Sequence, residues 1–110
     1  MWNREAKIRI HASIPVEIRG VDARGVSFEE RTEALEVSRR GLSILTERDL
    51  SLFGSLTVVI PGRGPALPNQ GPTDFFATAT VVRMDKEGEM YRVGIRFVGA
   101  TLSIYTPETP

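Results

Sequence analysis

Two short polar clusters in this sequence carry side chains that suit the binding of an anionic ligand. The first lies near the N-terminus and holds Arg4, Lys7 and Arg9, and the second is the segment Ser38-Arg39-Arg40-Gly41. An arginine guanidinium is planar and donates hydrogen bonds as a fork, which suits phosphate groups and the faces of purines. A serine and a glycine in a turn add a hydroxyl group and closely approachable backbone amides. The same residues are also typical of a solvated basic terminus and an ordinary hairpin turn, so composition alone leaves both interpretations open.

Catalytic and metal-binding chemistry has little support in the sequence. His11 is the only histidine and there is no cysteine, so the residue pairs that usually hold zinc are missing. Aspartates and glutamates are scattered without a spacing that would form an acid–base pair. The segment Gly62-Arg63-Gly64 lies in a proline-rich stretch and not between a strand and a helix, as a phosphate-binding loop requires. We therefore expect a protein that is not an enzyme and that has no metal or cofactor.

Length and composition predict one small domain. The chain has 110 residues, of which 41% are hydrophobic and 25% charged, as in ordinary globular domains. Fourteen basic residues balance fourteen acidic ones, which argues against a nucleic-acid partner. No stretch approaches the roughly 18 apolar residues of a membrane span, and no apolar run near the N-terminus indicates a signal peptide. Together with the absence of cysteine, these features favour a cytoplasmic protein without a membrane span.

The dominant hydrophobic period in the chain is two, which is the period of β-strands. The clearest alternation is in residues 90–98, where one face carries mainly apolar side chains and the other carries arginines and a glycine, namely Tyr91, Val93, Ile95 and Phe97 against Arg92, Gly94 and Arg96. The same pattern predicts six strands, over residues 13–19, 28–37, 42–46, 56–60, 75–84 and 90–98. In the second of them, Leu35 and Val37 are expected on one face.

The segments between these strands carry turn and loop signals. Glycine and polar residues predict turns at 20–25, 38–41 and 85–88, and residues 46–50 are predicted to form a helical turn capped by Thr46. Residues 61–72 are rich in proline and glycine, so we expect a mobile, exposed loop without regular pairing. We expect residues 1–10 to form a flexible basic lead-in and residues 100–110 a tail.

Six strands without an amphipathic helix must bury one face and remove their edges, and closure into a barrel does both. We therefore predict an all-β fold, a small six-stranded antiparallel barrel with no substantial helix, in which residues 1–110 form a single domain. Its core is expected to contain Val16, Val58, Ile95 and Phe97.

The order of these features resembles that of a PilZ domain, the bacterial receptor module for cyclic di-GMP. Members of that family typically have an RxxxR motif ahead of the first strand and a [D/N]xSxxG motif in the turn between the second and third strands. A GVVR-like strand and a GxxF strand follow near the end. The matching segments run from about Arg4 to Phe97 and comprise Arg9-Ile10-His11-Ala12-Ser13-Ile14-Pro15-Val16, Phe28-Glu29-Glu30, Glu36-Val37-Ser38-Arg39-Arg40-Gly41, Val81-Val82-Arg83 and Tyr91-Arg92-Val93-Gly94-Ile95-Arg96-Phe97.

The resemblance implies a split barrel of the PilZ type that works as a regulatory domain and senses cyclic di-GMP. In the family, the arginines hold phosphates and guanine edges, while the Asp or Asn and the Ser of the second motif bond the base. The residues expected to bind the ligand here are therefore Arg4, Arg9, Glu36, Ser38, Arg39, Arg40 and Gly41.

Two positions depart from the family pattern. If Arg9 is the second arginine of the pair, the first position is occupied by Glu5, and Arg4 is one residue out of register. At the Asp or Asn position, Glu36 keeps a carboxylate but moves its oxygens by roughly 1 Å and adds a rotatable bond.

These departures leave a second interpretation open, in which a degenerate PilZ-like domain binds no nucleotide and acts through a protein partner or an adjoining domain. A third class, a nucleic-acid-binding barrel of the OB type, is disfavoured by the balanced charge and by the lack of paired aromatic residues on which bases could stack.

Overall fold

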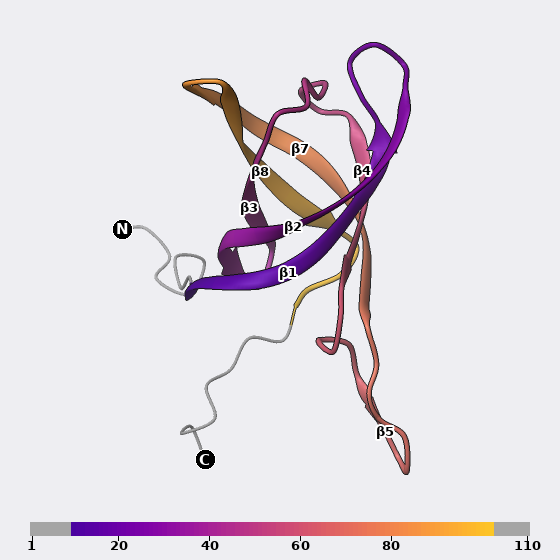
Figure 1. Ribbon diagram of the computed structural model, residues 1–110. Coiled ribbons are helices and arrows are strands. Elements are labelled where there is room, and N and C mark those ends of the chain that lie inside the picture. The colour runs from indigo at the N-terminus through magenta and orange to yellow at the C-terminus, as the bar shows by residue number, and fades with distance from the viewer. Residues whose placement is uncertain (1–9, 103–110) are drawn as a thin grey trace, which may run out of the picture.

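The computed structural model describes residues 10–102 and shows an all-β fold (Figure 1). Its strands are β1 (Ile10–Val21), β2 (Ser27–Ser38), β3 (Gly41–Thr46), β4 (Ser55–Ile60), β5 (Ala66–Leu67), β6 (Gly71–Pro72), β7 (Phe75–Glu87) and β8 (Met90–Val98). Residues 10–102 contain no helix. The predicted fold class is therefore confirmed, and five of the six predicted strands extend beyond their expected bounds at one end or both.

Six of these strands close into an antiparallel barrel in the order β1-β2-β3-β8-β7-β4. The barrel closes where β4 pairs with β1, with Ile18 opposite Val58. Closure gives every barrel strand two neighbours, which removes the unpaired edges that would otherwise invite aggregation. The seam between β3 and β8 joins strands from the two halves of the chain, so residues far apart in sequence meet on the outer surface there.

The inward-facing residues of these strands form one hydrophobic core. The four residues predicted for it are all buried, with exposed fractions of 2% for Val16, 0% for Val58, 3% for Ile95 and 6% for Phe97. The ring of Phe97 lies 5.0 Å from that of Phe75, centroid to centroid, in a tilted arrangement that aromatic pairs favour. The period-two pattern therefore identified the core correctly.

The alternation on β2 is interrupted by a bulge. The register with β3 shifts between Ala34 and Glu36, and Ala34 and Val37 are both buried whereas Leu35 is half-buried. A bulge places an extra residue on one strand and reverses the alternation after it. The prediction that Leu35 and Val37 share one face is wrong for this reason.

The predicted helical turn at residues 46–50 is also wrong, because residues 47 and 48 form bends and no helix follows. The buried Thr46 hydroxyl accepts the N–H of Arg48 at 3.1 Å and donates to the Glu30 carboxylate at 3.1 Å. Arg48 also donates from Nε to Glu30 at 2.8 Å and lies over the Phe28 ring. This local network offers the backbone an alternative to a helical turn.

Strand β7 continues to Glu87, and the turn to β8 consists of Gly88 and Glu89. Gly88 has a φ of 63°, which glycine adopts without steric cost. The predicted turn at residues 85–88 therefore started too early, and the β7 arm of the hairpin is longer than expected.

Residues 61–72 extend the β4–β7 hairpin away from the barrel and include the β5–β6 ladder (Figure 1). The N–H of Gly64 donates to the carbonyl of Thr73 at 2.8 Å. The segment is largely exposed, as predicted, but the expectation that it lacks regular pairing is wrong. Leu102, which the sequence predicts to lie in a tail, is 2% exposed and packs with the core.

We predict that Phe97→Ala lowers the free energy of unfolding by about 3–5 kcal/mol, because it leaves a cavity in the core. Phe76→Ala is the matched control, since Phe76 lies on the neighbouring strand and is 59% exposed. Chemical denaturation of both variants measures the difference. Similar losses in the two variants would mean that Phe97 does not lie in the core.

Candidate functional site

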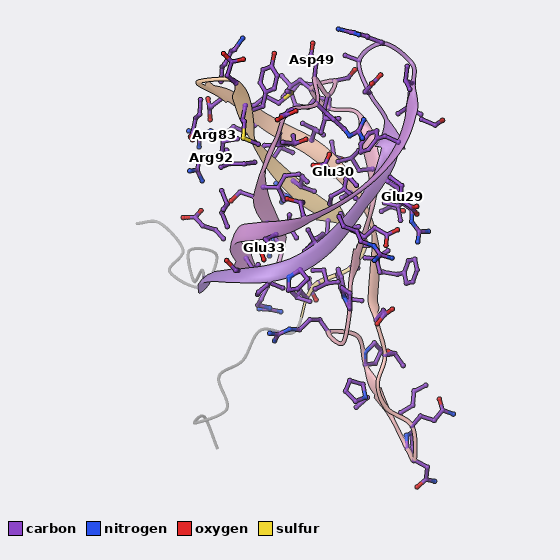
Figure 2. The ribbon with its side chains drawn as sticks, in the orientation of Figure 1. Glu29, Glu30, Glu33, Asp49, Arg83 and Arg92 are labelled. Atoms are coloured by element: carbon purple, nitrogen blue, oxygen red, sulfur yellow. The ribbon has the colours of Figure 1, made fainter. Side chains whose placement is uncertain are left out.

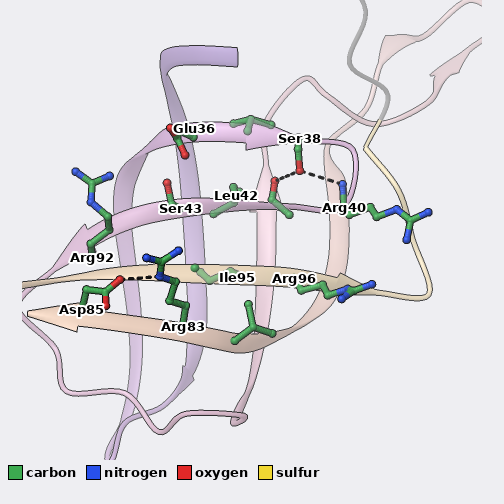
Figure 3. Close-up of a pocket in the computed structure, with 14 residues that line it drawn as sticks. Glu36, Ser38, Arg40, Leu42, Ser43, Arg83, Asp85, Arg92, Ile95 and Arg96 are labelled. Carbon is green, nitrogen blue, oxygen red and sulfur yellow. Dashed lines mark hydrogen bonds and ion pairs between the residues drawn. The ribbon is translucent and has the colours of Figure 1, made fainter. Parts of the chain in front are cut away.

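The outer face of β2, β3, β8 and β7 carries an open depression of about 620 Å³ (Figure 3). It has 14 lining residues, which include four arginines and two carboxylates. They are Glu36, Val37, Ser38, Arg40, Gly41, Leu42, Ser43, Val82, Arg83, Asp85, Arg92, Gly94, Ile95 and Arg96. The depression spans the β3–β8 seam and has the cationic character that an anionic ligand requires.

Strand register explains how these residues come together. Ser43 of β3 lies opposite Glu36 of β2 on one side and opposite Gly94 of β8 on the other, and Gly94 lies opposite Arg83 of β7. Two residues further along β8, Arg96 lies opposite Gly41. Because outward residues alternate with core residues, this one surface collects polar side chains from four strands.

The Ser38–Gly41 turn forms one end of the depression and is fixed by several hydrogen bonds. The Ser38 hydroxyl donates to the carbonyl of Gly41 and accepts the N–H of Arg40, both at 3.3 Å. The carbonyls of Arg40 and Arg39 accept the N–H groups of Phe97 and Leu102, each at 2.8 Å. The backbone carbonyls of Arg39 and Arg40 therefore tie the turn to the C-terminal part of the described chain.

The seven residues expected to bind the ligand fall into three groups. Four line the depression, namely Glu36, Ser38, Arg40 and Gly41. Arg39 is exposed but does not line it. Arg4 and Arg9 lie outside the described residues.

Gly41 has a structural reason of its own to be a glycine. A Cβ atom at this position would lie 2.0 Å from the carbonyl oxygen of Ile95, which is backbone and cannot move aside easily. The seam between β3 and β8 therefore depends on the missing side chain, whatever the ligand contacts.

The arginines of the β7–β8 hairpin are held by neighbouring carboxylates. Arg83 donates from Nε to Asp85 at 2.8 Å, and Arg92 donates from Nε to Glu87 at 2.6 Å. The bond to Glu87 and its negative charge raise the pKa of Arg92, and the charge of Glu36 adds to this effect. Figure 2 shows Arg83 and Arg92 together on the same side of the barrel.

The floor of the depression contains one unsatisfied polar atom. The hydroxyl oxygen of Ser43 is buried and has no hydrogen-bond partner among the residues the structure describes. Buried hydroxyl groups are nearly always paired, so Ser43 is an exception among the described residues.

Other kinds of site find no support in the described part of the chain. Between residues 10 and 102, no group of three or more histidines, cysteines, aspartates or glutamates could hold a metal ion. The same residues include no helix with the length and apolar character needed to cross a membrane.

Comparison with known families identifies the chain. The family model described as PilZ domain matches residues 3–104. The chain belongs to the PilZ family. No match was found among curated proteins. PilZ domains are binding and regulatory modules, and the family is one that binds cyclic di-GMP.

The PilZ assignment confirms the resemblance drawn from the sequence, but sequence reasoning missed part of the pocket. Arg83, Arg92 and Arg96 line it, and none was expected to bind the ligand. Their outward placement in the alternating pattern was a signal, because three arginines on the outer face of one hairpin concentrate charge. They were not singled out because outward arginines are usually solvated.

We predict that Gly41→Ala lowers the free energy of unfolding by about 1–3 kcal/mol, because the new methyl group overpacks the seam. Gly94→Ala is the control, since a Cβ atom there would lie 3.3 Å from the Cβ of Arg83, and we expect a change of about 1 kcal/mol or less. Thermal unfolding of both variants makes the comparison. Equal destabilisation would show that the approach of β3 to β8 is not the limiting constraint.

Proposed function

We propose that this PilZ domain is a regulatory module that senses cyclic di-GMP in the depression beside the Ser38–Gly41 turn. The observation that carries the proposal is the excess of arginines there. Arg40, Arg83, Arg92 and Arg96 outnumber the two carboxylates among the lining residues. The chain as a whole has no net charge, so the cationic character belongs to this surface.

The chemistry of the lining residues suits both parts of the ligand. Guanidinium groups donate paired hydrogen bonds to phosphate oxygens and to the acceptor edge of guanine. The carboxylate of Glu36 suits the amino and N–H donors on the opposite guanine edge, which adenine does not present in the same way. None of these groups needs to transfer a proton or attack the ligand, so binding is the activity we propose.

The first test compares two neighbouring arginines. Arg40 lines the depression and Arg39 does not, although both are exposed residues of one turn. We expect Arg40→Ala to weaken cyclic di-GMP binding by about 10-fold or more, because losing one charge-assisted hydrogen bond costs about 1.5–3 kcal/mol. Arg39→Ala should change the Kd by about 2-fold or less, since it removes the same charge from a screened position.

Isothermal titration calorimetry measures the Kd of the parent and both variants for cyclic di-GMP. Equal weakening by the two variants would indicate general attraction to the basic turn. A folded parent that shows no heat of binding at high micromolar cyclic di-GMP would overturn the proposed function.

The second test repairs the two departures from the family motifs. Glu5→Arg replaces a negative charge with a phosphate donor, and Glu36→Asp restores the shorter acceptor. We expect the double variant to bind cyclic di-GMP at least about 10-fold more tightly than the parent, a gain of about 1.4 kcal/mol. Adding Arg9→Ala should abolish the gain, because Arg9 is the arginine that matches the family motif. A folded double variant without improved binding would contradict this account of the motifs.

A second candidate function is protein interaction without a nucleotide, and one observation favours it. Phe53 is 71% exposed and has a φ of 68°. A bulky side chain in the left-handed region is strained, and an exposed aromatic ring gains little from burial in return. Leu52 beside it is 51% exposed, so the β3–β4 loop presents an apolar pair to a partner. This candidate becomes the leading one if the repaired variant binds no cyclic di-GMP.

A further inference from the structure

The arginines of the depression lie at its two ends. Arg96 lies opposite Gly41 and therefore belongs to the end formed by the Ser38–Gly41 turn. Arg92 is four residues away on β8 and lies opposite Asp85. At about 3.4 Å per strand residue, the backbones of Arg96 and Arg92 are about 14 Å apart. Arg83 lies opposite Gly94, but its guanidinium pairs with Asp85, the residue opposite Arg92. We call Arg40 and Arg96 the turn end, and the guanidinium groups of Arg83 and Arg92 the hairpin end.

Small residues of β8 and β3 line the floor between the two ends. Gly94 lies between Arg92 and Arg96 on the outward face of β8, and a Cβ atom there would approach the Cβ of Arg83 to 3.3 Å. Ser43, opposite Gly94 on β3, adds only a small hydroxymethyl group. A flat group can therefore lie over Ser43 and Gly94, bordered on the β7 side by the Arg83 side chain.

The guanidinium groups of the hairpin end are held in place before any ligand arrives. Arg83 and Arg92 each use Nε to bond a carboxylate on the same hairpin, Asp85 and Glu87 respectively. These bonds do not consume the two terminal amino groups of either arginine. Because each carboxylate restricts the rotation of its arginine, less conformational entropy remains to be lost when an anion binds.

We infer that Arg83 and Arg92 bind the half of the ligand that the turn does not hold, and that the pocket for this reason selects a dinucleotide over a mononucleotide. The inference rests on the proposed function and extends it to residues outside the RxxxR and [D/N]xSxxG motifs. Cyclic di-GMP carries two guanines and two phosphates, so it can engage both ends at once. GMP has one of each and can occupy only one end.

The test measures ligand preference. Cyclic di-GMP is titrated by calorimetry and GMP by NMR chemical-shift changes, against the parent and the Arg83→Ala/Arg92→Ala variant. We expect the variant to lose about 10-fold or more in affinity for cyclic di-GMP while its affinity for GMP changes by less than about 3-fold. The ratio of the Kd for GMP to the Kd for cyclic di-GMP therefore falls by several-fold or more.

The matched control is the variant Arg19→Ala/Arg31→Ala. It removes the same two charges, and both of these arginines also pair through Nε with a carboxylate, Glu17, but neither lines the depression. We expect this control to leave the ratio unchanged. If the Arg83→Ala/Arg92→Ala variant melts early, Arg83→Lys/Arg92→Lys replaces it, because lysine keeps the charge but lacks the fork. That replacement should still lower the ratio.

The outcomes separate this inference from the function on which it rests. If the parent binds cyclic di-GMP and both double-alanine variants bind it equally well, the hairpin end is not part of the site and only the inference is overturned. A parallel loss of GMP affinity in the hairpin variant would also overturn the selection of a dinucleotide. A parent that binds neither nucleotide overturns the proposed function and the inference together.

Discussion

The close backbone approach of β3 to β8 at Gly41 is the constraint on which the site depends. The carbonyl of Ile95 occupies the space that a side chain at residue 41 would need. This seam joins the first three strands of the barrel to β8, β7 and β4. The depression lies across it, so the motif residues of β2 and β3 face arginines that come more than 40 positions later in the chain. Without the seam, neither half of the chain would carry a complete pocket.

The hydrogen bonds of the turn reinforce the same seam. Two consecutive carbonyls, those of Arg39 and Arg40, are bonded by amides of Leu102 and Phe97. Backbone bonds of this kind contribute about 1 kcal/mol each to stability, but they also fix the direction in which the two arginine side chains leave the turn. Arg40 therefore lies beside the pocket and Arg39 does not. This difference depends on tertiary contacts that the local sequence does not reveal.

The sequence predicted the barrel well because a period of two records which face of a strand is buried. The same pattern could not locate the bulge at Leu35, since a leucine is acceptable on either side of a strand. It also could not distinguish Arg83, Arg92 and Arg96 from solvated surface residues, because outward arginines look alike until strand register brings them together. The net charge of the chain also gave no indication of this cationic surface. The chain balances its charges as a whole, while four arginines and two carboxylates share one depression. The family motifs identified the turn, and only the fold identified the hairpin that completes the pocket.

The ion pairs of the β7–β8 hairpin are better explained by how they orient Arg83 and Arg92 than by a contribution to the stability of the fold. The Arg83 side chain is 75% exposed and that of Asp85 is 48% exposed, and exposed pairs of this kind contribute little to folding free energy. Glu36 adds a further element, because its charge acts on Arg92 across the pocket. A carboxylate between cationic ends disfavours a phosphate at the centre but accepts hydrogen bonds from a base there. Under the proposed function, the ends of the depression suit phosphates and its centre suits a base. The longer side chain of Glu36 is then compatible with binding, since its charge acts on Arg92 of β8 and does not depend on the exact length of the motif residue alone.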